Sequence, residues 1–174
     1  MKYRTICADP PWRLNQVAAS KANAEKVYAT MDLDAIKSLP IAALAENDAY
    51  LWLWGINSMM EEAHQVVRAW GFSPRTIITW CKSGQPGVGA YLRNNTEHCI
   101  VAVRGKPQTP DTKPLSTWFV WPRGPHSQKP DAFYDLVEQV SPGPYVEVFA
   151  RRHRFFWDVW GNESANTAQM ETAT

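Results

Sequence analysis

The chain has 174 residues, a formal net charge of +1, 20% charged residues and 45% hydrophobic residues. This length predicts one domain, while the hydrophobic content excludes a disordered chain and the balanced charge excludes a uniformly basic coat. No apolar run approaches the ~18 residues of a membrane helix. Three cysteines without a Cys-x-x-Cys pair favour a reduced, cytoplasmic protein without a metal site.

The first predicted strand, Tyr3–Ala8, stops at Asp9-Pro10-Pro11-Trp12, because proline cannot continue a strand ladder. The next expected elements are a short helix from Asp32 to near Pro40, a strand over Ala49–Trp54, and a helix that Asn57 caps and Gly71 ends. Three strands are expected after that helix, over Thr76–Cys81, His98–Arg104 and Ser116–Trp121. A helix over Asp131–Val140 and strands over Tyr145–Phe149 and around Phe155–Val159 complete the list. The polar segment 164–174 is expected to be a frayed tail after one domain, 1–163.

Strands and helices therefore alternate, which predicts an α/β sheet with helices on both faces. Ligands of such sheets bind beyond the carboxyl ends of the strands. Asp9, the Cys81-Lys82 pair and the segment after Glu147 occupy such ends in this sequence.

The segment Asp9-Pro10-Pro11-Trp12 combines a carboxylate, two residues without a backbone N–H and a flat aromatic ring. Carboxylate and carbonyl oxygens accept hydrogen bonds, so such a segment suits an amino group whose ring stacks on the tryptophan. Methyl transfer to the exocyclic amine of adenine needs such a site. A strand-ending turn with a packed tryptophan is the alternative interpretation.

The ADPPW string resembles the signature of the amino-methyltransferases, which use S-adenosylmethionine. The resemblance continues, in order, through VYATM, LWLWGINS, WGF, IITWCK, EHCIVAVRGKPQ, HSQKP, SPG, EVFARRH and WGNE, from Tyr3 to Glu163. These blocks are similar to the adenine methyltransferase family that includes the catalytic subunit of the mRNA adenosine methyltransferase and many bacterial and phage DNA enzymes. The resemblance implies one Rossmann-like methyltransferase domain with a mostly parallel sheet, in which the catalytic segment precedes the cofactor segment.

The family pattern implies that Asp9, Pro10, Pro11 and Trp12 hold the target amine and ring. It assigns the cofactor carboxylate to Lys129 and the ribose to Glu147. Its expected cofactor contacts are Asp9, Lys129, Glu147, Phe149, Arg151, His153, Asn162 and Glu163. Glu163 departs from the pattern, because close relatives have an amide there.

Nucleic-acid contacts are expected from a basic stretch between Arg75 and Lys106, where five basic residues stand against one acidic residue. The substrate-binding candidates are Tyr28 and Trp12 for stacking on the target base, and Lys82, Arg93 and Arg104 for phosphates. An ordinary mixed-charge surface is the alternative.

The sequence thus favours an S-adenosylmethionine-dependent adenine-N6 methyltransferase that acts on DNA. The same reaction on RNA is the first alternative, and an inactive nucleic-acid-binding partner subunit is the second. Family relatives often work as pairs, so a homodimer or a partner subunit is plausible, whereas a membrane and a metal are not expected.

Overall fold

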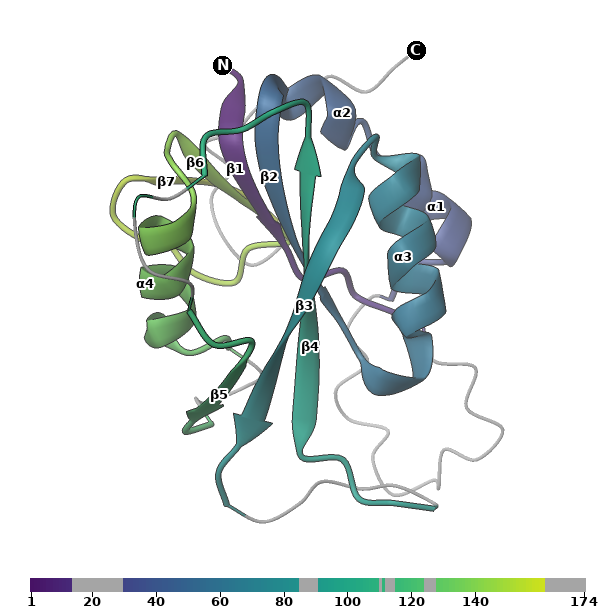
Figure 1. Ribbon diagram of the computed structural model, residues 1–174. Coiled ribbons are helices and arrows are strands. Elements are labelled where there is room, and N and C mark those ends of the chain that lie inside the picture. The colour runs from purple at the N-terminus through teal and green to yellow at the C-terminus, as the bar shows by residue number, and fades with distance from the viewer. Residues whose placement is uncertain (14–29, 85–90, 110, 112–114, 124–127, 162–174) are drawn as a thin grey trace.

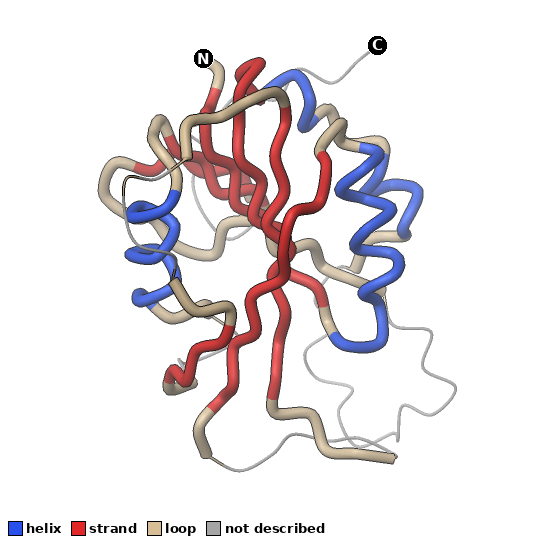
Figure 2. Tube along the Cα trace, viewed as in Figure 1, coloured by secondary structure: helices blue, strands red, loops and turns tan. Residues whose placement is uncertain are grey.

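The computed structural model describes residues 1–13, 30–84, 91–109, 111, 115–123 and 128–161. Within them, seven strands form one twisted sheet in the order β5-β3-β4-β2-β1-β6-β7 (Figures 1 and 2). The strands are β1 Tyr3–Ala8, β2 Ala45–Gly55, β3 Ser73–Lys82, β4 Thr96–Arg104, β5 Trp118–Trp121, β6 Tyr145–Val148 and β7 Trp157–Trp160. The helices are α1 Leu33–Lys37, α2 Ile41–Leu44, the 3-10 turn η2 Asn57–Met59, α3 Met60–Ala69 and α4 Asp131–Val140.

Strand β4 runs against the direction of the others. It pairs antiparallel with β2 and β3, whereas the pairs β1–β2, β1–β6, β6–β7 and β3–β5 are parallel. The expected mostly parallel sheet is therefore confirmed. Because of its direction, β4 begins at the edge where its neighbours end.

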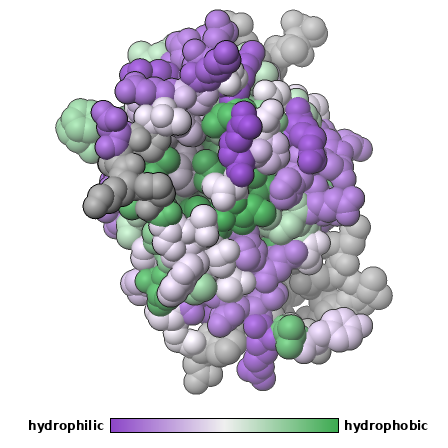
Figure 3. Space-filling view, viewed as in Figure 1, coloured by the Kyte–Doolittle hydropathy of each residue, from purple (hydrophilic) through white to green (hydrophobic). Residues whose placement is uncertain are grey.

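Helices cover both faces, as the alternation predicted: α1, α2 and α3 lie on one side and α4 on the other (Figure 1). Alternate side chains of β1 and β2 feed two cores, since successive residues of a strand point to opposite faces. Ile6 and Leu51 pack with the α3 side, while Cys7 and Trp52 pack with the α4 side. Figure 3 shows hydrophilic side chains over much of one face and an apolar area near its middle.

Most differences from the expected elements lie at their ends. Strand β2 begins at Ala45 rather than Ala49. Helix α3 begins at Met60 rather than directly after Asn57, because Asn57–Met59 form the 3-10 turn η2 and Met59 precedes the helix. The expected single helix before Pro40 is two short ones, α1 and α2.

The last two strands also differ from expectation. Strand β6 ends before Phe149, and β7 begins after Phe156. Both phenylalanines have φ of 66°, a left-handed conformation that does not fit a strand ladder. Helix α4 has the expected bounds. The expected tail, 164–174, lies outside the described residues.

Candidate active site

The candidate site lies at the edge of the sheet where β1, β3 and β6 end. Ala8, the last residue of β1, pairs with Leu53 on one side and Val148 on the other, so Asp9 leaves the sheet beside Phe149. At the same edge, the Cys81–Thr96 pair brings the start of β4 next to the end of β3. Three separate stretches of sequence therefore meet around Asp9.

The backbone carbonyls of Pro10 and Pro11, which follow β1, each already accept one hydrogen bond. The Pro10 carbonyl accepts the Trp12 N–H at 2.8 Å, and the Pro11 carbonyl accepts the Met31 N–H at 2.9 Å. Each carbonyl retains one lone pair. Trp12 and Met31 also form an isolated parallel bridge, which joins the two ends of the chain segment between them.

The Trp12 ring packs into the core rather than presenting an open face. The residue is only 8% exposed, and its indole N–H donates to the Trp54 carbonyl at 3.1 Å. Trp12 therefore packs in the wall of the site, and its stacking on the target base stays a prediction.

Lys129 lies at the centre of the site, immediately before α4. Its ammonium donates to Asp9 Oδ2 at 2.8 Å and to Glu97 Oε2 at 3.0 Å, and lies 4.8 Å from the centre of the Trp54 ring. Burial would lower the pKa of Lys129, but the two carboxylates outweigh it, and the pKa is raised above its ordinary value. Lys129 therefore stays charged although its side chain is only 8% exposed.

Glu97 joins a second lysine to this group. Its other carboxylate oxygen pairs with the Lys82 ammonium at the end of β3. Burial would raise the pKa of Glu97, but Lys129 and Lys82 together lower it. Lys82 also lies over the Trp80 ring, at 4.8 Å from its centre. Lys82, expected to contact phosphate, is thus bound to a carboxylate of the site.

Glu147, on β6, forms a second polar centre under α4. The Tyr134 hydroxyl donates to Glu147 Oε1 at 2.7 Å, and both side chains are buried. Burial raises the pKa of Glu147 to about 7, against the opposing effect of the Tyr134 hydrogen bond. Arg152 lies over the Tyr134 ring, at 5.1 Å from its centre, and donates to Asp131 on α4 at 2.5 Å.

A narrow cavity of about 10 Å³ connects these two centres. It is lined by Asp9, Gln128, Lys129, Tyr134, Glu147, Phe149, Arg151 and Arg152. Five of the residues expected to bind a cofactor thus line one cavity, and Arg152 lies where its movement would widen it.

The remaining expected residues are not gathered here. His153 is exposed and does not line the cavity. Tyr28, Asn162 and Glu163 lie outside the described residues.

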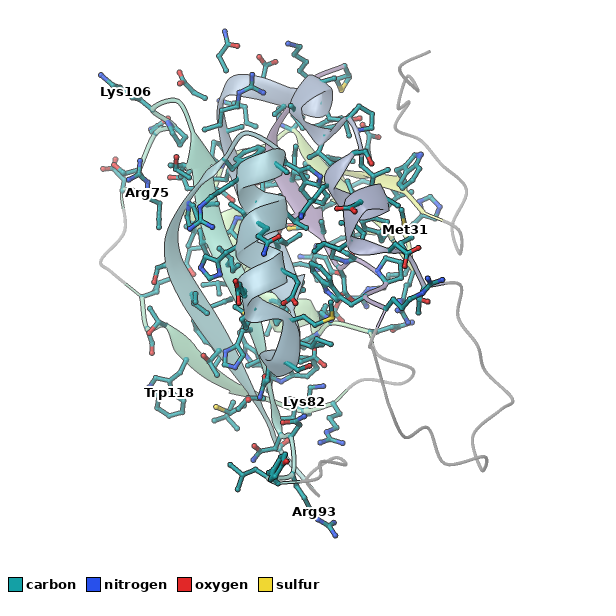
Figure 4. All side chains as sticks on the ribbon, turned by 90° about the vertical axis from the view of Figure 1, so that its right-hand side faces the viewer. Met31, Arg75, Lys82, Arg93, Lys106 and Trp118 are labelled. Atoms are coloured by element: carbon teal, nitrogen blue, oxygen red, sulfur yellow. The ribbon has the colours of Figure 1, made fainter. Side chains whose placement is uncertain are left out.

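The basic stretch is divided between the two ends of the molecule. Figure 4 shows Lys82 and Arg93 at one end and Arg75 and Lys106 at the other. Arg104 pairs with Ala49, near the start of β2, and donates to the Ala42 carbonyl at 2.8 Å. About five strand residues separate Ala49 from the site edge, or roughly 15 Å. Arg104 therefore does not join Lys82 and Arg93, because the reversed direction of β4 carries it away.

Four site residues were missed by the sequence reasoning. Glu97 and Trp54 surround Lys129, whereas Tyr134 and Arg152 surround Glu147. Tyr134 had a signal, since it follows Phe133 on α4 and lies one turn after Lys129 and Pro130. Glu97 had none without the direction of β4.

The residues present suit a ligand with a carboxylate and a ribose. Lys129 has three N–H donors, of which two are used on Asp9 and Glu97. The buried Trp54 indole N–H has no hydrogen-bond partner within the described part of the chain. A buried carboxylate, Glu147, is placed for hydroxyl groups. Within the described ranges, no group of three or more His, Cys, Asp or Glu residues is arranged to hold a metal ion, and no helix is long and apolar enough to cross a membrane.

This sheet, together with a carboxylate at the end of β1 and a second one on β6, defines a Rossmann-like methyltransferase domain. The family model MT-A70 matches residues 3–163, and the chain belongs to the MT-A70 family.

Named relatives agree with this assignment. The chain is 30% identical over 172 residues to the human N(6)-adenosine-methyltransferase catalytic subunit METTL3, and 31% identical over 173 residues to a Medicago truncatula putative N(6)-adenosine-methyltransferase MT-A70-like protein. Each match covers 93% of this chain but only 28% and 26% of those relatives. It is 29% identical over 182 residues to the type II methyltransferase M.MunI of Mycoplasma sp, with 93% of this chain and 78% of that relative covered.

Proposed function

We propose that this chain transfers a methyl group from S-adenosylmethionine to the N6 amine of adenine in DNA. The observation that carries the proposal is the Asp9 carboxylate, held at the end of β1 by Lys129 through one oxygen. Its side chain is 22% exposed, and the structure gives its other oxygen no hydrogen bond within the described part of the chain, so we assign that oxygen to the ligand. Two prolines follow it, and neither has an N–H that could compete for that oxygen.

Asp9 would act on the amine by accepting one of its N–H groups. The N6 lone pair of adenine is conjugated with the ring and is a weak nucleophile. Hydrogen bonding to Asp9, and to the remaining lone pair of the Pro10 carbonyl, favours the pyramidal amine, whose lone pair is free to attack. The transfer would leave the methyl donor as a neutral thioether, and the methylated, cationic amine would pass one proton to the Asp9 carboxylate and from there to water. Positioning and electrostatic stabilisation therefore supply most of the catalysis.

The cofactor would lie along the cavity between the two polar centres. S-adenosylmethionine supplies the methyl group as an electrophile when it is bound. Lys129 would bind its carboxylate with the third N–H of the ammonium, and Glu147 would accept hydrogen bonds from its ribose. The cavity of about 10 Å³ is too small for the cofactor, so Arg152 would have to swing away from Tyr134 on binding.

We place DNA first as the substrate because one relative, 29% identical over 182 residues, is the type II methyltransferase M.MunI. RNA remains the alternative because the N(6)-adenosine-methyltransferases have similar identity to this chain.

Labelled methyl transfer to DNA and RNA of matched sequence tests the proposal. The wild-type chain should label DNA, and Asp9→Ala should abolish labelling without unfolding the chain. Glu61→Ala, a carboxylate loss on the exposed side of α3, is the matched control. Labelling of RNA alone would move the assignment to the alternative, and undiminished turnover in Asp9→Ala would refute the role of Asp9.

A further inference from the structure

Four charged side chains at the site form an alternating chain, Lys82–Glu97–Lys129–Asp9. They come from the end of β3, the start of β4, the residue before Pro130 at α4, and the end of β1. Each of the two inner members is shared: Glu97 binds both lysines, and Lys129 binds both carboxylates. Two positive and two negative charges balance, so the group is neutral as a whole.

We propose that Glu97 is a positioning residue for the methyl transfer proposed above: it shares the Lys129 ammonium with Asp9, and so keeps one Asp9 oxygen free for the target amine. The inference rests on the proposed function of the site. Glu97 acts through Lys129, and no contact between Glu97 and a substrate is part of the inference.

The geometry fixes how the donors of Lys129 are divided. One N–H is used on Asp9 Oδ2 at 2.8 Å and one on Glu97 Oε2 at 3.0 Å. The Trp54 ring, 4.8 Å from the ammonium, occupies another side. One N–H remains for a ligand, because an ammonium has three. Glu97 thus fixes the rotation of the ammonium as well as its position.

Loss of Glu97 would leave Asp9 as the sole carboxylate partner of a buried ammonium. The ammonium would then draw on both Asp9 oxygens, since a buried charge without its partners is strongly unfavourable. The target amine would compete with Lys129 for the same oxygens. A weaker ion pair also lowers the pKa of Lys129, because burial acts on it with less opposition.

A purely structural ion pair is the competing explanation. Buried ion pairs often contribute little net stability, so a structural role predicts a changed unfolding free energy and an unchanged division between binding and turnover. The two explanations therefore differ in what Glu97→Gln does to kcat and to its pH profile, whereas the titration of Lys129 tests whether Glu97 is coupled to Lys129 at all. Gln has nearly the same shape as Glu, so the fold should persist in this variant.

The first measurement needs no activity. NMR of labelled lysines, with Lys129 assigned from Lys129→Met, follows the charge state of Lys129 as the pH is raised. In the wild type, Lys129 should keep its charge beyond the pH range of an ordinary lysine, whereas in Glu97→Gln, with one carboxylate partner lost, it should lose its proton at a lower pH than in the wild type. Glu97→Asp keeps the negative charge, so the titration of Lys129 in this variant should lie close to that of the wild type. Identical titration of Lys129 in wild type and Glu97→Gln would overturn the inference.

The second measurement separates turnover from binding. We expect kcat of Glu97→Gln to fall about tenfold to a hundredfold, the loss expected for a hydrogen bond to a charged group, with the cofactor dissociation constant changed less than about threefold. The alkaline limb of its pH–kcat profile should move to lower pH. Glu61→Gln, the same charge change on exposed α3, should leave all three unchanged. An unchanged kcat and alkaline limb in Glu97→Gln would overturn the inference while leaving the proposed function intact. A wild type without methyl transfer would overturn the proposed function, and with it the positioning role of Glu97.

Discussion

The buried Glu147 carboxyl should make the unfolding free energy of the wild type depend on pH more strongly than that of the amide variant Glu147→Gln. Its pKa is raised from 4.5 to about 7, chiefly by burial. Such a difference corresponds to about 3 kcal/mol against the ionised form in the folded state. The native state therefore holds the proton more tightly than the unfolded state between these two pH values.

The sign follows from that difference. Below about pH 4.5 the carboxyl is protonated in both states, and Glu147→Gln should unfold with nearly the wild-type free energy. As the pH rises through 7, the wild type should lose up to about 3 kcal/mol relative to the variant. Chemical denaturation of both proteins at a series of pH values measures this difference. If the unfolding free energies of the two proteins changed with pH in parallel, the raised pKa of the buried Glu147 carboxyl would be refuted.

Ligand binding should depend on the same group in the opposite direction. A ribose hydroxyl donates best to the ionised carboxylate, whose population rises about tenfold from pH 6 to pH 8 for a pKa of about 7. The probe is 5′-methylthioadenosine, which keeps the ribose but lacks the titratable groups of methionine. Its affinity should rise about tenfold over this range in the wild type, and should not change with pH in Glu147→Gln. Tyr134→Phe removes a hydrogen bond to the ionised form and should move both transitions to higher pH.

Four further substitutions test other parts of the molecule. Trp12→Ala should reduce the unfolding free energy by about 3–5 kcal/mol, as for a buried aromatic ring; a stable variant that loses only turnover would instead indicate stacking on the base. Arg93→Ala should flatten the salt dependence of nucleic-acid binding by roughly one unit per lost contact, and Arg104→Ala should not, because it lies at the far end of the sheet. Lys129→Met should weaken S-adenosylmethionine binding by about 1.5–3 kcal/mol in calorimetry, and an unchanged dissociation constant would place the cofactor carboxylate elsewhere.

The sequence predicted the parts of this molecule that depend on local chemistry. Two prolines placed Asp9 at the end of β1, and the apolar spacing of α4 gave its bounds. The alternation of elements predicted the mostly parallel sheet with helices on both faces. These features need no knowledge of which strands are neighbours.

The direction of β4 is what could not be predicted from the sequence. This reversal explains where two residues lie: Arg104, at the end of the strand, is far from the candidate site, and Glu97, near its start, lies inside it. The charge count along the chain placed Glu97 and Arg104 in one basic stretch. The nine residues of β4, however, hold the two ends of the strand roughly 25–30 Å apart. The burial of Trp12 was equally hidden, because it depends on the Trp54 carbonyl 42 residues away.

Two backbone contacts beside the site have a consequence for how this domain could be engineered. Trp12 and Met31 form a parallel bridge, and the Lys82 N–H donates to the Asn95 carbonyl at 2.8 Å. In each pair the two residues are in contact, so the number of residues between them can change without moving the strands. Each doubling of that number adds only about 0.6 kcal/mol of closure entropy. The residues between these positions can therefore be exchanged for those of relatives, joined at residues 12 and 31 or 82 and 95, without redesigning the core.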